Sequence, residues 1–252
     1  MIAVLVDIDD TLVDLTSARR DGLRAHLSTL APELASGEGF HPALTQWRQL
    51  EREHVDRFLR GETSLAEQRR TRVRAFCLAH RLPQQGSDEQ CDAWYAQFQA
   101  HCDAVLRPFP DVAEALDELR RRGVTLGALS NNVHAVQELR LRRVKLRDRI
   151  SALLCCDDLG GASKPDPQAF HAACAALGSA PERTVLVGDD REVDARGAAA
   201  AGLIGVWLDR TADPHPPADV PTVASLTGLV DWLDAAALLP ARTSERCVGH
   251  AH

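Results

Sequence analysis

Short apolar runs alternate with amphipathic stretches along much of the chain. Ala3 to Val6 is an apolar run with β-branched residues, which is typical of a strand buried on both faces of a parallel sheet. Further strands are expected at 124–129, 151–155, 184–187 and 204–208. Helices are expected at 111–122, 133–143, 167–177, 194–201 and 226–239. This alternation predicts an α/β fold: a Rossmann-like parallel sheet with helices on both faces and right-handed crossovers.

A long stretch after the first strand shows only helical spacing. Residues 15–106 contain no strand pattern, and Trp94, Phe98 and Cys102 share one stripe of a predicted helix. Pro32 and a turn at Gly37–Gly39 are expected to end the first helix. The expected helices are 15–30, 42–60, 64–80 and 87–104. This pattern predicts an antiparallel helical bundle inserted into the α/β domain.

The insertion defines the expected domain organisation. Residues 1–14 and 107–240 form the α/β core domain, and residues 15–106 form the helical domain. The proline-rich stretch 209–221 is expected to be a surface loop. Residues 241–252 are expected to be a flexible tail.

Polar residues follow the predicted strands where each strand ends. Asp7 and Asp9 come after the first strand, Ser130 after the second and Asp189 after the fourth, and Lys164 precedes a helix that can reach the same edge. Open α/β sheets bind ligands at the carboxyl ends of their strands. Carboxylates this close raise each other's pKa unless a cation or fixed donors hold them, and Mg²⁺ prefers oxygen ligands. The sequence therefore predicts a magnesium and phosphate site.

The composition of the chain indicates which classes of binding partner and which compartment to expect. The 252-residue chain is 45% hydrophobic with a net charge of -7, and its pI of about 5.8 argues against a nucleic-acid or anionic-membrane partner. We find no apolar run of about 18 residues and no signal region. Seven cysteines without C-x-x-C spacing fit a reducing compartment, so a cytoplasmic protein is expected.

The order of the motifs gives a more specific indication than any motif alone. Asp7-Ile8-Asp9-Asp10-Thr11 comes first, followed by Leu129-Ser130-Asn131, then Lys164-Pro165-Asp166-Pro167, then Gly188-Asp189 with Asp194 five residues beyond. In this order the chain resembles the haloacid dehalogenase superfamily, in the subclass with a helical cap after the first motif. The resemblance extends over residues 1–239 and specifies no substrate.

The resemblance implies a role for each matching residue. Asp7 is expected to be the nucleophile that forms an aspartyl-phosphate and, through its other oxygen, a ligand of Mg²⁺. Asp9 is expected to be the general acid and base, with its backbone carbonyl on the metal. Asp189 is the remaining expected metal ligand. The other expected roles are phosphate binding by Thr11, Ser130, Asn131 and Lys164, charge neutralisation by Lys164, and metal support by Asp190 and Asp194.

The implied function is a magnesium-dependent phosphatase acting on a small phosphorylated metabolite. A phosphomutase would keep all of these residues. A 2-haloacid dehalogenase would form an ester at Asp7 but would not need acid–base help from Asp9 or a magnesium site. A phospho-acceptor regulatory domain also pairs acids after its first strand, but its phosphorylated aspartate lies on the third strand and it has no helical cap.

Four arginines lie within six residues of a predicted helix of the cap. Arg69 and Arg72 are three residues apart and share one face, while Arg70 and Arg74 share another. One interpretation is a solvated face with acidic partners. The other is that Arg69 and Arg72 bind an anionic, non-reacting end of the substrate, since guanidinium groups bind carboxylate or phosphate bidentately.

Overall fold

The computed structural model describes residues 2–83, 85–211 and 219–240. The chain divides into an α/β unit, Met1–Leu12 with Phe109–His252, and a helical unit, Val13–Pro108. The domain boundaries expected from sequence, after residues 14 and 106, each differ from these by two residues. The expected tail at 241–252 and the middle of the expected loop at 209–221 lie outside the described residues.

A parallel sheet forms the centre of the α/β unit. Within the described residues it has six strands in the order β3-β2-β1-β4-β5-β6. The strands are β1 (Ala3–Val6), β2 (Thr125–Ser130), β3 (Ala152–Cys155), β4 (Thr184–Gly188), β5 (Ile204–Leu208) and β6 (Thr222–Val223). This architecture confirms the predicted fold class. Strand β6 was not predicted, because two residues are too few to show a hydrophobic pattern.

Strand β1 lies in the middle of the sheet, between β2 and β4. All of its residues are buried, and Val6 pairs with Ala128 of β2 and with Val187 of β4. Because all three strands run in parallel, their carboxyl ends meet at one edge. This pairing brings the loops after β1, β2 and β4 together.

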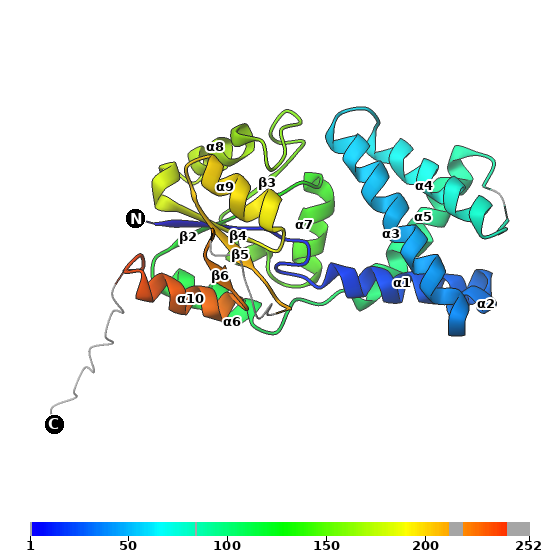
Figure 1. Ribbon diagram of the computed structural model, residues 1–252, viewed down its shortest axis with the longest axis horizontal. Helices are drawn as coiled ribbons and strands as arrows, with labels where there is room; N and C mark the ends of the chain where they lie inside the picture. Colours follow the sequence, from blue (N-terminus) through cyan, green and yellow to red (C-terminus); the bar gives the residue numbers. More distant parts are fainter. Residues whose placement is uncertain (1, 84, 212–218, 241–252) are drawn as a thin grey trace, which may run out of the picture. The chain divides into compact units, whose positions relative to one another are not determined.

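Helices cover both faces of the sheet (Figure 1). Helices α8 and α9 lie on one side, where Phe170 and Ala198 pack against Leu5 and Leu186 of the strands, and α6 and α10 lie on the other. Their bounds are α6 (Val112–Arg121), α7 (His134–Arg143), α8 (Pro167–Ala176), α9 (Gly197–Ala200) and α10 (Leu226–Ala235). The helix predicted at 194–201 is a π-helical turn, Arg191–Arg196, followed by α9. The last helix ends four residues before the predicted Leu239.

The helical unit has a core of its own. Trp47 and Phe98 pack with ring centroids 4.8 Å apart, and Phe76 and Trp94 join the same buried cluster. The helices are α1 (Leu15–Leu30), α2 (Pro32–Ala35), α3 (Gly37–Leu59), α4 (Leu65–Ala79) and α5 (Asp88–Val105). The predicted turn at Gly37–Gly39 is wrong, because these residues begin α3. None of the described helices combines the length and the apolar character needed to cross a bilayer.

Candidate active site

A buried ion-pair chain lies at the carboxyl edge of the sheet. The Lys164 ammonium contacts Oδ1 of Asp7 at 2.6 Å and Oδ1 of Asp194 at 2.7 Å, and all three side chains are at most 10% exposed. Asp7 follows the central strand, and its backbone N–H donates to the Val187 carbonyl at 2.9 Å. The lysine therefore sits between two carboxylates that come from different loops.

Asp189 completes a group that we call the carboxylate cluster, Asp7, Asp189 and Asp194. One oxygen from each of the three lies within 4.8 Å of the other two. Thr11, fully buried, links the first and fourth strand-end loops, because its hydroxyl accepts a hydrogen bond from the Asp189 N–H at 3.0 Å. The predicted phosphate contact of Thr11 stays a prediction.

The electrostatics of the cluster favour a bound cation. Burial raises the pKa of Asp7 well above its ordinary value, and the neighbouring carboxylates add to this rise while Lys164 opposes it. Loss of hydration, with Asp194 and Asp10, raises the pKa of Asp189 to about 7. Burial alone would lower the pKa of Lys164, but Asp194 and Asp7 raise it. Three carboxylates against one lysine leave two negative charges, which matches a divalent cation with oxygen ligands.

Gly188 makes room for the Asp194 carboxylate. A Cβ atom at this position would lie 2.1 Å from Oδ2 of Asp194. That oxygen also accepts the N–H of Asp190 at 3.2 Å. The glycine of the Gly188-Asp189 motif is therefore required by the close packing of the carboxylate cluster.

Two predicted site residues bond to backbone groups through their side chains. The Asn131 amide donates to the Lys164 carbonyl and accepts the Lys164 N–H, both at 2.7 Å, so it fixes the loop that carries the lysine. Asp190 accepts the N–H groups of Glu192 and Val193 at 2.9 Å and is the N-cap of the π-helical turn. Both side chains hold loops of the site, and their predicted contacts with phosphate and metal stay predictions.

Asp9 binds two side chains of α7 that sequence reasoning missed. Its Oδ1 pairs with the Arg140 guanidinium, and its Oδ2 accepts from the Gln137 amide at 3.0 Å. The same Gln137 nitrogen donates to the Ser130 hydroxyl at 2.8 Å. Gln137, Arg140 and Leu141 form the buried face of α7. The signal available in the sequence was that Gln137 and Arg140 lie on the same helical face as the apolar Leu141.

The two arginines proposed from sequence lie in different surroundings within the helical unit. Arg72 is 1% exposed, contacts Glu51 at 2.6 Å and stacks over Trp47, so its guanidinium is bound within the helical unit, and its predicted contact with a substrate stays a prediction. Arg69 stacks over Tyr95 with 4.8 Å to the ring centroid. It lines a hollow of about 500 Å³ between α4 and α5 together with Tyr95, Gln99 and Asp103.

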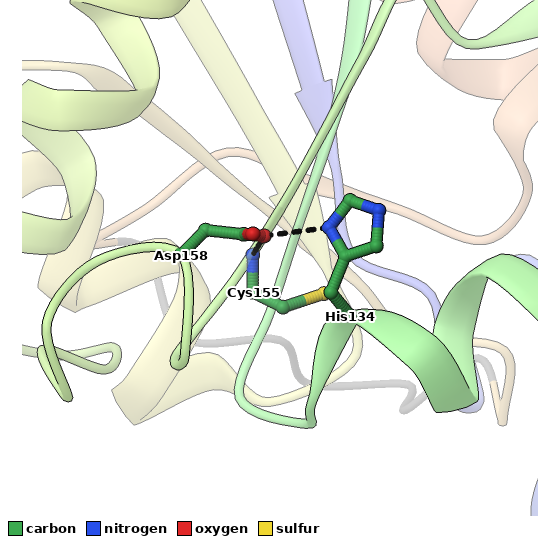
Figure 2. A group of neighbouring side chains, drawn as sticks. All are labelled: His134, Cys155 and Asp158. Carbon is green, nitrogen blue, oxygen red and sulfur yellow. Dashed lines mark hydrogen bonds and ion pairs between the residues drawn. The ribbon is translucent and has the colours of Figure 1, made fainter.

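A second group of metal-ligand types lies where β3 ends and α7 begins, and we call it the His134 cluster: His134, Cys155 and Asp158. Figure 2 shows the His134 ring and the Cys155 backbone nitrogen directed at the Asp158 carboxylate. Oδ2 of Asp158 receives both, His134 Nδ1 at 2.7 Å and the Cys155 N–H at 2.9 Å. Burial raises the pKa of the Cys155 thiol, which keeps the sulfur protonated. These bonds secure the turn after β3 against the start of α7.

The arrangement in the α/β unit combines the parts needed to attack a phosphoryl group. Asp7 is a buried carboxylate beside a lysine, Ser130 offers a hydroxyl one strand away, and Asp9 lies two residues after Asp7. Covalent catalysis by a carboxylate requires a nucleophile of this kind and a group that moves protons.

Comparisons with known proteins agree with this geometry. The family model described as "haloacid dehalogenase-like hydrolase" matches residues 1–202. A glyceraldehyde 3-phosphate phosphatase from Methanopyrus kandleri is 30% identical over 87% of this chain and 90% of its own. A phosphoserine phosphatase from Thermus thermophilus is 39% identical, and that match spans 43% of each chain.

Solved structures share the fold. The magnesium-bound HAD-hydrolase YfnB from Bacillus subtilis has a TM-score of 0.74 over 92% of this chain and 98% of its own, at 19% identity. A 2-haloacid dehalogenase from Pseudomonas syringae has a TM-score of 0.65 over 94% of this chain and 100% of its own, at 26% identity. The fold is thus shared by proteins with different reactions, and the site has to separate them.

Proposed function

Because the chain belongs to the haloacid dehalogenase-like hydrolase family, we propose that it is a magnesium-dependent phosphatase of small phosphorylated metabolites. The observation that carries the proposal is the buried contact of Lys164 with Asp7 inside the carboxylate cluster. The similarity to phosphatases over most of both chains supports the same reaction class.

The reaction has two steps in which Asp7 is first a nucleophile and then a leaving group. An Asp7 oxygen attacks phosphorus, the bond to the leaving oxygen breaks, and that oxygen takes a proton from Asp9. Water then attacks the aspartyl-phosphate while Asp9 accepts its proton. The bond between phosphorus and Asp7 breaks, which releases phosphate and restores the carboxylate.

Lys164 and Ser130 serve both steps. The ammonium of Lys164 offsets charge on the nucleophile and on the phosphoryl oxygens, and the Ser130 hydroxyl donates to one of those oxygens. Asp194 and Asn131 keep the lysine in place from two sides. This pre-organised charge costs no rearrangement during the reaction.

The residues present fit a magnesium ion. The carboxylates of Asp7 and Asp189 and the backbone carbonyl of Asp9 would hold it, with Asp194 beside them. When bound, Mg²⁺ neutralises the phosphoryl oxygens and permits the approach of an anionic nucleophile.

The carboxylate cluster also separates the phosphatase from a dehalogenase. A dehalogenase forms its ester on an aspartate without a metal, so it gains nothing from the two further carboxylates, Asp189 and Asp194, that lie beside Asp7. A phosphomutase would use the same groups and differ only in returning the phosphoryl group to a second substrate hydroxyl instead of to water.

A panel of phosphorylated metabolites, assayed for phosphate release with and without Mg²⁺, tests the proposal. We expect magnesium-dependent release from at least one sugar or hydroxy-acid phosphate, with acid-labile phosphate on Asp7 after rapid quenching. Chloride release from a 2-chloro acid in the absence of metal, without phosphate release, would establish the dehalogenase instead.

We propose that Arg69 contributes to substrate selection through the hollow that it lines with Tyr95. Arg69→Met should raise KM for an anionic metabolite by roughly 10- to 100-fold, the equivalent of one charged hydrogen bond, and leave a simple aryl phosphate unaffected. Arg121→Met, at an exposed arginine of α6, is the matched control. An unchanged KM for the best metabolite would show that Arg69 does not contribute to substrate binding.

A further inference from the structure

The orientation of the Gln137 side chain follows from its neighbours. Arg140 donates to Gln137 Oε1 at 3.1 Å. A guanidinium group cannot accept a hydrogen bond, so the atom facing it must be the amide oxygen. The amide nitrogen then points to the other side, where it meets Ser130 at 2.8 Å and Asp9 at 3.0 Å. Each of its two hydrogens has an acceptor.

The Ser130 hydroxyl is oriented by these contacts. Its oxygen receives the Gln137 amide at 2.8 Å and the Asn132 N–H at 3.3 Å. With two donors directed at the oxygen, the proton of the hydroxyl remains to be donated elsewhere. A proton available for donation is what a phosphoryl oxygen requires from this residue.

Asp9 is held by the same pair of side chains. One oxygen contacts Arg140 and the other contacts Gln137, so the carboxylate is fixed through both oxygens. Gln137 is fully buried and Arg140 is 6% exposed, and they lie one helical turn apart on α7. A rigid helix therefore determines the place of a carboxylate that follows a different strand.

We propose that Gln137 and Arg140 are positioning residues that orient the acid–base carboxylate of Asp9 and the phosphate-binding hydroxyl of Ser130 as one unit. This rests on the phosphatase function proposed above. Gln137 contacts both groups, whereas Arg140 contacts Asp9 and the oxygen of the Gln137 amide. The two residues consequently have separable effects.

Two aryl phosphates distinguish these effects. The ratio kcat/KM reports the step in which the leaving group departs, and phenolate needs a proton more than 4-nitrophenolate does. Arg140→Met should lower kcat/KM for phenyl phosphate by roughly 10- to 100-fold and for 4-nitrophenyl phosphate by less than about threefold. Gln137→Met should lower both, because Ser130 also loses its orientation, and should weaken inhibition by orthovanadate.

Double variants show whether Arg140 acts through Asp9. In an Asp9→Asn background, adding Arg140→Met should change the ratio between the two substrates by less than about twofold. The matched control is Arg142→Met, which removes an exposed arginine two residues away on the same helix. If Arg140→Met does not fold, Gln137→Met alone tests the unit through vanadate and the substrate ratio.

The outcomes separate this proposal from the phosphatase function. Magnesium-dependent turnover and phosphorylated Asp7 in the wild-type protein test the function. Given that activity, equal losses on both substrates for Arg140→Met, or unchanged vanadate inhibition in Gln137→Met, would overturn the positioning roles. A wild-type protein without turnover would instead overturn the function.

Discussion

The carboxylate cluster and the His134 cluster use similar ligand types at neighbouring strand ends, yet their electrostatics differ. Asp158 receives an imidazole nitrogen and a backbone N–H, and the nearby thiol stays protonated. In the carboxylate cluster one lysine serves two carboxylates, and the pKa values of Asp7 and Asp189 both rise. Proximity of ligand atoms alone does not distinguish a cation site from a structural cluster. The two differ in whether the negative charge of the carboxylates exceeds the positive charge around them.

The largest effect is expected at Asp7. Asp7→Asn keeps the size of the side chain but removes the attacking oxygen, so turnover should fall on the order of 10⁴-fold or more. Circular dichroism and thermal unfolding should show an intact fold, and no acid-labile phosphate should form. Near wild-type turnover in this variant would show that Asp7 is not the nucleophile.

Metal removal should have the next largest effect. Exhaustive chelation should abolish phosphate release, and added Mg²⁺ should restore it, because the negative charges of the cluster otherwise repel an anionic substrate. Calcium should restore activity poorly, since it tolerates looser geometry. Full activity after chelation would mean that Lys164 compensates the cluster by itself.

The pH dependence of magnesium binding gives a finer test. A carboxyl with a pKa of about 7 in the folded protein and an ordinary value when unfolded costs stability as pH rises from about 4 through about 7. Ionisation of Asp189 should therefore lower the free energy of unfolding of the metal-free protein as the pH rises over that range. Binding of Mg²⁺ displaces the proton of the Asp189 carboxyl. The rise in Tm caused by a fixed millimolar concentration of Mg²⁺ should therefore be larger at pH 8 than at pH 6.

A reversed order of those two Tm shifts would show that Asp189 is already ionised at pH 6. Asp189→Asn provides the control, because an amide cannot titrate. In this variant the stability of the metal-free protein should depend less on pH, and the effect of Mg²⁺ should be nearly lost.

The smallest effect is expected in the His134 cluster. Asp158→Asn should leave the magnesium dependence of activity unchanged and lower the free energy of unfolding by about 0.5–1.5 kcal/mol, the typical net contribution of a hydrogen bond, because this carboxylate is partly exposed. The measurement is urea unfolding beside a magnesium titration. A sulfur-to-metal absorption band on adding Co²⁺, lost in Cys155→Ala, would contradict the view that this cluster is only structural.

The sequence predicted those parts of the fold and site that have a periodic or local signal. Continuous apolar runs identified five strands. Asp7 and Asp189 stood out as polar residues after buried strands, and Lys164 stood out in the motif before a predicted helix. The short strand Thr222–Val223 and the π-helical turn lacked such a signal. Helix α3 begins at Gly37, where glycines suggested a turn. Gly37 has a positive φ of 57°, and a Cβ atom on Gly39 would lie 2.5 Å from the Glu33 carbonyl oxygen, so both glycines are needed where the chain enters the helix.

Contacts between distant residues account for the remaining misses. Gln137 and Arg140 acquire their partner Asp9 across more than a hundred residues of sequence, and only the sheet brings them together. Arg72 was interpreted from its neighbours in sequence, whereas its environment is set by Glu51 on another helix. A charged residue can be recognised in a sequence, but its partner depends on the tertiary fold.

The chain passes between the two units twice, after Leu12 and after Pro108, and these two connections have an evolutionary consequence. In the α/β unit, the Phe109 N–H donates to the Leu12 carbonyl at 3.1 Å, and in the helical unit Val13 and Pro108 form an antiparallel bridge. Each unit therefore brings its own two chain ends together. Exchanging the inserted segment for another requires little new loop-closure entropy on either side. Lineages could then diversify the insertion as a module while the catalytic sheet keeps its register.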